Sequence, residues 1–437
     1  MIDPSDRSRT RDEDRTFTYW WSRPSRLVLF LHVPVFLICG MLDESAYALY
    51  KQNSRFFAGT VFFYGLMALM AFAAASAYFE PKDARISAVD PVPVFMVDKV
   101  LNVLFVLVFC AYAIFMFPLV TKPQLLIDIA QGSPDAMYNL RNSLSRIPGV
   151  TSLVSLGSLL TALTILYRPL TGKDLPAIYW KLMLGVFVAG VLRAWLWSER
   201  LAVIELGLAG TIAMLAKGNP KHRHLGIKPL TFAPLLGLVA LIVLFGLGEY
   251  FRSWQFYRNV FPGSYAEFIL IRIAGYYATS LNNGAALVTL NDPFFFPTFT
   301  AEWFYRLPLW SVLGFSPVES VFDNDSWTLF LEAYLNPEFN NSSGIYVPFF
   351  DFGSIIGIAY WAAAGALSGY LFRGFAEGQL AGLLIYPVWF IGVVEMLRIF
   401  YWGDQRFFPV ILAALIILRY FTRSGVARAV PAGGMLT

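Results

Sequence analysis

The arginines are the residues of this chain whose placement suggests chemistry. A long aromatic segment, 249–345, separates two stretches apolar enough to span a bilayer, and it has four arginines but no lysine. These are Arg252, Arg258, Arg272 and Arg306. A guanidinium stays charged when partly desolvated and holds phosphate oxygens through paired hydrogen bonds. The pattern predicts a site for a lipid-linked phosphate, although a general preference of the chain for arginine would also produce it.

A short turn between two other apolar segments supplies further charge. It carries Arg193, Glu199 and Arg200, and the two arginines are two helical turns apart, so they share a face if the helix is continuous. Long side chains reaching from a helix end to the membrane interface would explain them without a ligand. Against this alternative, cations are disfavoured on the non-cytoplasmic face, to which the charge pattern assigns this turn.

The last connection between apolar segments brings two more arginines to the same side. We therefore predict that one set of guanidinium groups binds a pyrophosphate. This set comprises Arg193, Arg200, Arg252, Arg258, Arg272, Arg398 and Arg406.

Three carboxylates are candidates for orienting or deprotonating an acceptor hydroxyl group. They are Asp351, Glu199 and Glu249. Asp351 lies where the chain re-enters the membrane, and it could instead pair with an arginine or cap a helix. Gly353 and Gly357 follow at a spacing typical of close helix packing.

Aromatic side chains of the same region offer flat faces on which sugar rings can stack. The predicted glycan-binding residues are Trp254, Tyr257, Tyr276 and Tyr346. An aromatic belt at the membrane interface is the alternative explanation for several of them. The sequence has no phosphate-binding glycine loop, no HExxH and no CxxC motif, so neither a metal nor a cofactor is predicted.

Composition defines the fold class. The chain has 437 residues, of which 57% are hydrophobic and 14% charged, whereas a soluble domain has roughly a quarter charged residues. Backbone groups in hydrocarbon must be satisfied within each span, so the prediction is an all-α polytopic integral membrane protein. A net charge of +4 gives no indication of nucleic-acid binding. Cys39 and Cys110 both lie in apolar stretches, and no disulfide is expected.

About ten apolar segments are long enough to be considered transmembrane helices. They lie at about 27–43, 56–78, 99–121, 150–167, 177–197, 201–216, 231–248, 346–371, 380–397 and 407–421. The large loop falls between the seventh and eighth, and its stretch 264–290 has the periodicity of a helix lying at the outer interface. The predicted division is a tail (1–26), a transmembrane bundle (27–248), the loop (249–345), C-terminal transmembrane helices (346–421) and a second tail (422–437).

The basic residues of the short connections predict the orientation. The densest cluster contains Lys217, Lys221, Arg223 and Lys228, and placing it in the cytoplasm puts both tails there as well. The 249–345 loop is then periplasmic. The connection 122–149 is an exception, because it would lie outside despite its basic residues.

At these residues the chain resembles the repeat-unit polymerases of O-antigen and exopolysaccharide assembly (Wzy-type). The matching parts are the turn with Arg193, Ser198 and Arg200, the large outer loop with its arginines, and the re-entry into the membrane. The re-entry runs from Asn341 through Gly-Ile-Tyr-Val-Pro-Phe-Phe into Asp351-Phe-Gly, and it is the most specific of the three. The layout covers most of the chain, whereas the motifs themselves are loose.

The resemblance implies a fold akin to the membrane-embedded glycosyltransferases, in the bacterial inner membrane. It implies transfer of a glycan from an undecaprenyl-pyrophosphate donor to the next lipid-linked repeat unit, with arginines on the diphosphate and no obligatory metal. Chain-length regulator and flippase proteins are the partners it suggests, in addition to the donor, the acceptor and the bilayer. The product could be O-antigen or exopolysaccharide.

Two alternatives remain at this point. A transporter or flippase for a lipid-linked or anionic solute would have a similar composition, but no internal repeat is visible. An O-antigen-type ligase is the other, and such ligases use a histidine of the outer loop. The 249–345 segment contains no histidine, which favours a polymerase.

The sequence generates one direct prediction. Arg200→Lys or Arg252→Lys keeps the charge but loses the planar fork, so each change should abolish long glycan chains at normal protein abundance. Gel analysis of cellular polysaccharide measures this, and wild-type chain lengths in both variants would refute the assignment of these two residues.

Overall fold

The computed structural model describes most of the chain. The described residues are 16–17, 19–82, 85–86, 91–130, 136–144, 147, 149–196, 201–216, 229–307, 310, 313 and 324–426. Glu199, Arg200 and the basic loop 217–228 lie outside them.

The described chain is helical apart from one pair of two-residue strands, β1 (Thr16–Phe17) and β2 (Arg85–Ile86), which are antiparallel. The helices of the first half are η1 (Trp20–Ser22), α2 (Pro24–Leu27), η2 (Val28–His32), α3 (Val33–Met41), α4 (Glu44–Leu49), α5 (Gly59–Phe79), α6 (Val94–Thr121), α7 (Gln124–Ala130), α8 (Ala136–Ser143), η3 (Thr151–Ser155) and α9 (Leu156–Thr171). Those of the second half are α10 (Ala177–Leu196), α11 (Leu201–Ala216), η5 (Pro229–Phe232), α12 (Ala233–Glu249), η6 (Tyr250–Trp254), α13 (Gln255–Tyr257), α14 (Tyr265–Leu290), α15 (Glu302–Tyr305), α17 (Asn324–Tyr334), α18 (Val347–Ala376), α19 (Leu380–Glu395), η7 (Tyr401–Gly403) and α20 (Phe407–Val426).

The structure is that of a multi-pass helical membrane protein. Within the described ranges, six helical stretches are long and apolar enough to cross a bilayer, judged by length and composition. They are 24–41, α5, α6, 151–171, α10 and α18. The shorter apolar helices are α11, α12 and α19. Each of the ten apolar segments of the sequence therefore coincides with helix, and six of them reach the length and hydropathy of a span.

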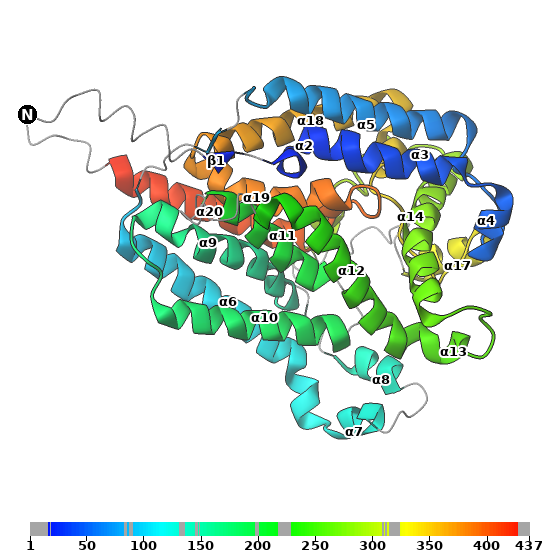
Figure 1. Cartoon of the computed structure of the whole chain (residues 1–437), viewed down its shortest axis with the longest axis horizontal. Coiled ribbons are helices and arrows are strands. Elements are labelled where there is room, and N and C mark those ends of the chain that lie inside the picture. Colours follow the sequence, from blue (N-terminus) through cyan, green and yellow to red (C-terminus); the bar gives the residue numbers. More distant parts are fainter. Residues whose placement is uncertain are drawn as a thin grey trace, which may run out of the picture.

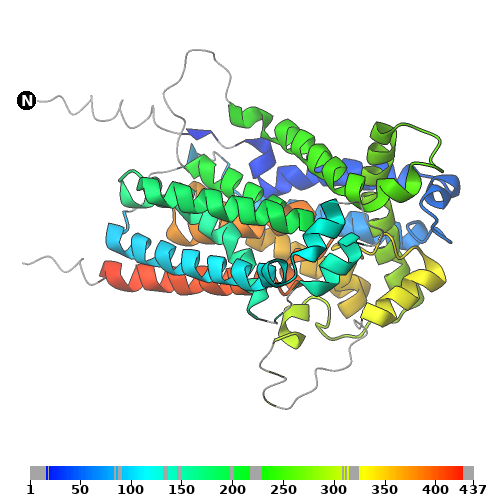
Figure 2. The same ribbon diagram turned by 90° about the horizontal axis from the view of Figure 1, so that it is seen from below.

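The long helices lie side by side along a common direction, whereas α14 crosses it (Figure 1). The same arrangement is seen from below in Figure 2, with α6, α10 and α20 running alongside one another. The helix expected over 264–290 is confirmed as α14, and it begins with a capping box in which Ser264 and Glu267 satisfy each other's backbone N–H groups.

Helices α5 and α18 are in close backbone contact. A Cβ atom at Gly365 would lie 2.2 Å from the carbonyl oxygen of Phe72, and one at Gly369 would lie 2.3 Å from that of Ser76. These two glycines, four residues apart, allow the backbones to touch, as small residues do in membrane helix pairs.

Gly353 and Gly357 act differently from the close-packing pair that their spacing suggests. Gly353 has φ 77° and ψ 179°, so it breaks α18 rather than packing against another helix. A Cβ at Gly357 would meet the ring of Phe349, which belongs to the segment before that break.

The α5–α18 contact leads to a stability prediction. Gly365→Ala should lower the free energy of unfolding by about 1–3 kcal/mol, because the new methyl group must push two backbones apart. Gly237→Ala is the matched control, since a Cβ there meets nothing within 4 Å. Thermal unfolding in detergent measures both, and an equal midpoint for the two variants would contradict the close contact.

Candidate functional site: arginine and carboxylate clusters

A buried arginine cage lies where α12, α14 and the segment before α18 meet. We use this name for Arg272, Glu249 and Glu338. The Arg272 guanidinium lies 3.3 Å from Glu249 Oε2 and 2.6 Å from Glu338 Oε1, and its side chain is only 6% exposed. Two carboxylates therefore neutralise one buried cation.

Aromatic rings complete the cage. The guanidinium lies 4.7 Å from the centre of the Phe339 ring and about 6 Å from the rings of Tyr257, Phe268 and Tyr276. The Tyr257 hydroxyl donates a hydrogen bond to Glu338. Burial disfavours the charge on Arg272, but Glu249 and then Glu338 outweigh it and raise its pKa above the usual value.

Several residues that the sequence predicted to bind a ligand make structural contacts in or next to the cage. Glu249 is fully buried beside Arg272, and Tyr276 is 9% exposed. Trp254 packs against Tyr265 and Phe268. In this conformation the guanidinium of Arg272 is enclosed by protein groups rather than open to a phosphate.

The arginines next to the cage differ in their surroundings. Arg258 is exposed at the end of α13. The backbone of Arg252 lies in η6, and its side chain lies outside the described part of the structure.

Asp351 anchors the loop that follows α14. Its carboxylate accepts hydrogen bonds from the backbone N–H groups of Phe299 and Thr300, at 2.9 and 2.6 Å, and from the Thr300 hydroxyl at 2.7 Å. The side chain is fully buried. The structure shows a structural role for Asp351, because its carboxylate binds a loop and not an arginine.

Tyr346 belongs to the core. It is 1% exposed, its hydroxyl donates to the carbonyl of Val61, and its ring packs edge-on against Phe57. Neither face of this ring is open to a sugar.

Arg193 lies at the C-terminal end of α10, where it is 7% exposed. It donates a hydrogen bond to the Tyr112 hydroxyl and lies over the ring of Phe115. Glu205, one turn into α11, accepts a hydrogen bond of 3.0 Å from the Tyr401 hydroxyl. Glu199 and Arg200, the other two predicted residues of this turn, lie outside the described residues.

A second group of charges is more exposed, and we call it the loop-end cluster. It comprises Glu302 and Arg306 of the 249–345 loop together with Asp404 and Arg406 of the α19–α20 connection. Arg306 Nε lies 2.6 Å from Glu302 Oε1, and Arg406 Nε lies 3.8 Å from Asp404 Oδ1. Its four side chains are between 27% and 38% exposed.

Aromatic stacking and a close backbone approach hold these two segments together. The rings of Trp303 and Phe408 are stacked with their centres 4.3 Å apart. A Cβ at Gly403 would lie 2.6 Å from the carbonyl oxygen of Phe299, so only glycine fits there. Phe299 is in turn bound by Asp351, which links the anchor to the cluster.

Glu302 is the functional candidate that sequence reasoning missed. Burial raises the pKa of its carboxyl to about 7, against the opposing effect of Arg306 and with a further rise from Asp404. A carboxyl group with this pKa can accept and release a proton near neutral pH. The only sequence signal was its position four residues before Arg306.

Arg398 lies just after α19, in the connection that leads to the loop-end cluster. Its Nε donates to Glu395 Oε2 at 2.7 Å, and its side chain is 21% exposed. Its backbone carbonyl accepts from Ser280 of α14. Tyr276 interacts electrostatically with both Arg398 and Arg272, and Tyr401 does so with both Asp404 and Arg406.

Exposure separates the predicted phosphate-binding arginines into two kinds. Arg272 and Arg193 are 5% and 7% exposed and surrounded by protein groups. The side chains of Arg398 and Arg406 are 21% and 27% exposed; Arg398 pairs with the buried Glu395 and Arg406 with the partly exposed Asp404. Within the described residues, no group of three or more histidine, cysteine or acidic side chains could hold a metal ion.

Comparison of the chain with protein-family models, with curated proteins and with solved structures gives no match.

The cage predicts that two arginines of the same loop have different roles. Arg272→Gln should lower stability by about 3–5 kcal/mol, because it leaves two carboxylates without their cation in a buried site. Arg258→Gln is the control for the same chemical change at an exposed position. The fraction of monomeric protein after heating in detergent reports the difference, and similar behaviour of the two variants would exclude a structural role for Arg272.

Proposed function

We propose that the chain is a glycosyltransferase that polymerises undecaprenyl-pyrophosphate-linked repeat units at the periplasmic face of a bacterial inner membrane. The proposal includes about ten transmembrane helices, cytoplasmic termini and a periplasmic loop between the seventh and eighth. The observation that supports it most is the loop-end cluster, in which partly exposed arginines lie next to a carboxyl group with a pKa of about 7.

In this proposal Arg398 and Arg406 bind the diphosphate of the donor. Both lie in the connection between α19 and α20, and their side chains are 21% and 27% exposed. A diphosphate leaving group gains negative charge as its bond to the sugar breaks. Fixed donors at that point can each contribute about 3–4 kcal/mol to lowering the barrier.

Glu302 takes the role of the base. The acceptor hydroxyl attacks the anomeric carbon of the donor sugar, and the bond from that carbon to the diphosphate oxygen breaks. The proton of the hydroxyl passes to the Glu302 carboxylate, and the undecaprenyl diphosphate leaves on the arginines. Arg306, 2.6 Å from Glu302, stabilises the carboxylate form before the transfer.

The buried groups support this site without touching the substrate. Asp351 fixes residues 299–300 immediately before α15, and the arginine cage fixes the start of α14. Tyr401, which donates a hydrogen bond to Glu205, interacts electrostatically with Asp404 and Arg406 of the cluster. The exposed Arg258 is free to meet the glycan or a second phosphate at the loop surface.

The proposal predicts a pH profile. Transfer should become faster as the pH rises from 6 to 8, because the active carboxylate form of Glu302 grows from about a tenth to about nine tenths of the protein. Glu302→Gln should reduce the rate by about 10²–10⁴-fold and flatten the profile. The measurement is the rate of glycan lengthening by protein reconstituted with lipid-linked repeat units.

The same assay tests the arginines. Arg398→Lys should lower the rate at least tenfold, since lysine cannot both pair with Glu395 and bind the phosphate through a fork. Arg168→Lys is the control, because Arg168 forms an exposed ion pair with Asp174 far from the cluster in sequence. Movement of the lipid-linked glycan without any lengthening would show a transporter and contradict the proposal.

A further inference from the structure

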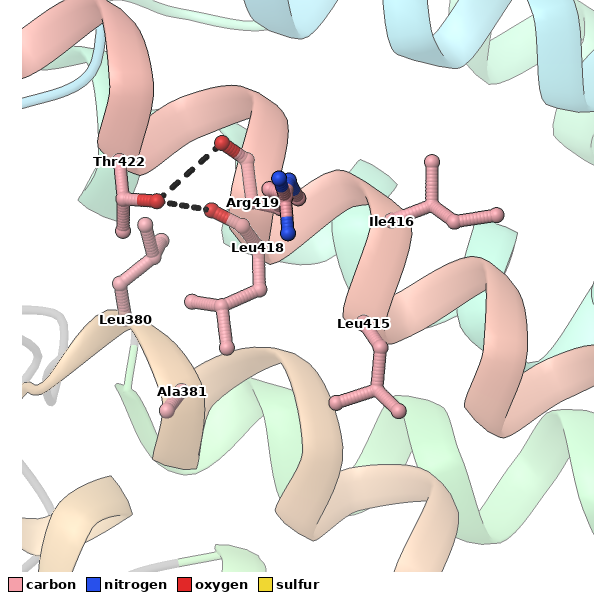
Figure 3. A pocket seen from close by; sticks show the side chains of 7 residues that line it. All are labelled: Leu380, Ala381, Leu415, Ile416, Leu418, Arg419 and Thr422. Atoms are coloured by element: carbon pink, nitrogen blue, oxygen red, sulfur yellow. Dashed lines mark hydrogen bonds between the residues drawn. The ribbon is translucent and has the colours of Figure 1, made fainter.

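An open groove lies between the start of α19 and the last turns of α20. Its volume is about 730 Å³, and it is lined by Leu380, Ala381, Leu415, Ile416, Leu418, Arg419 and Thr422. Figure 3 shows Leu380 of α19 and Leu418 of α20 pointing toward each other across it. The groove is apolar for most of its length and ends at one cation.

The walls of the groove are open to the surroundings. Leu415 and Ile416 of α20 are 48% and 59% exposed. The Thr422 hydroxyl donates to the carbonyls of Leu418 and Arg419 and is therefore satisfied within the helix. An exposed apolar surface on a membrane protein is an expected contact for acyl chains.

Two arginines carry the charge at this end of α20. Arg419 lines the groove, and Arg423 is four residues further along α20, so they lie on the same face. Both are exposed, and neither has an ion pair or hydrogen bond from its side chain within the part of the chain that the structure describes. The nearest acidic residue in sequence on the α19 side, Glu377, accepts a hydrogen bond from Gln379.

We propose that this groove binds an anionic phospholipid of the bilayer. The phosphate group pairs with Arg419 and Arg423, and an acyl chain lies along Leu415, Ile416 and Leu380. An exposed apolar wall continues into two guanidinium groups that have no partner among the described residues, which fits a molecule with both a hydrocarbon chain and a negative headgroup. A soluble phosphate would use the arginines alone, and a zwitterionic lipid would gain less from them.

This site is independent of the proposed transfer reaction. The groove lies toward the last turns of α20, whereas the loop-end cluster adjoins its first residue, Phe407. The inference therefore stands or falls separately from the proposed function.

Lipid binding to the purified full chain tests the proposal. Native mass spectrometry of the delipidated protein would be used to titrate phosphatidylglycerol and phosphatidylcholine of the same chain length. We expect tighter binding of phosphatidylglycerol, and about fivefold weaker binding for each of Arg419→Gln and Arg423→Gln, the factor expected for one cation at a membrane surface. Lys122→Gln removes an exposed cation at the opposite end of α6 from Lys99, the residue that contacts Tyr420 of α20, and it should leave binding unchanged.

A second variant tests the apolar wall. Ile416→Ser keeps both arginines and changes an exposed side chain, so the protein should fold while its affinity for phosphatidylglycerol falls severalfold. Equal binding of the two lipids would overturn the proposal. Wild-type affinity in a variant that combines Arg419→Gln and Arg423→Gln would overturn it too. Equally strong competition by glycerol 3-phosphate would also overturn it, since the headgroup alone would then account for binding.

Discussion

A single buried cation between two carboxylates holds the large loop on the helical bundle. Arg272 of α14 pairs with Glu249 at the end of α12 and with Glu338 shortly before α18, so three segments far apart in the chain meet at one charge. Removing Arg272 leaves two carboxylates without their cation in a site enclosed by aromatic rings, which is costly. The position of α14, and of everything the loop carries after it, depends on this arrangement.

Asp351 provides the second attachment. Gly353 breaks α18 with a positive φ, and the turn before the break presents the Asp351 carboxylate to the backbone N–H groups of Phe299 and Thr300. Two residues further along, Glu302 then faces the α19–α20 connection. The buried charges thus affect the loop-end cluster only by holding its residues in place. The partly exposed charges are available to bind a ligand. This division explains why one loop contains arginines of such different exposure.

Much of the fold follows from the sequence. Long apolar runs in hydrocarbon can only be helices, so all ten segments coincide with helix, and the periodic stretch at 264–290 is α14. The roles of the individual charged residues could not be predicted from the sequence. Arg272 and Arg398 look alike in sequence, and only the tertiary positions of Glu249 and Glu338 distinguish an enclosed guanidinium from an accessible one. Glu302 was missed for the same reason, because its pKa is raised by burial in the folded chain and further by Asp404, about a hundred residues away in sequence.

Sidedness is the most direct test of the account, because the loop-end cluster must face the periplasm while the arginines at the far end of α20 face the cytoplasm. The measurement is labelling of single cysteines by a membrane-impermeant thiol reagent, in a background where Cys39 and the exposed Cys110 are replaced by serine. Glu302→Cys and Arg406→Cys should react in intact spheroplasts, and Arg423→Cys only after lysis. Labelling of position 423 in intact cells, with 302 and 406 protected until lysis, would contradict the proposed function.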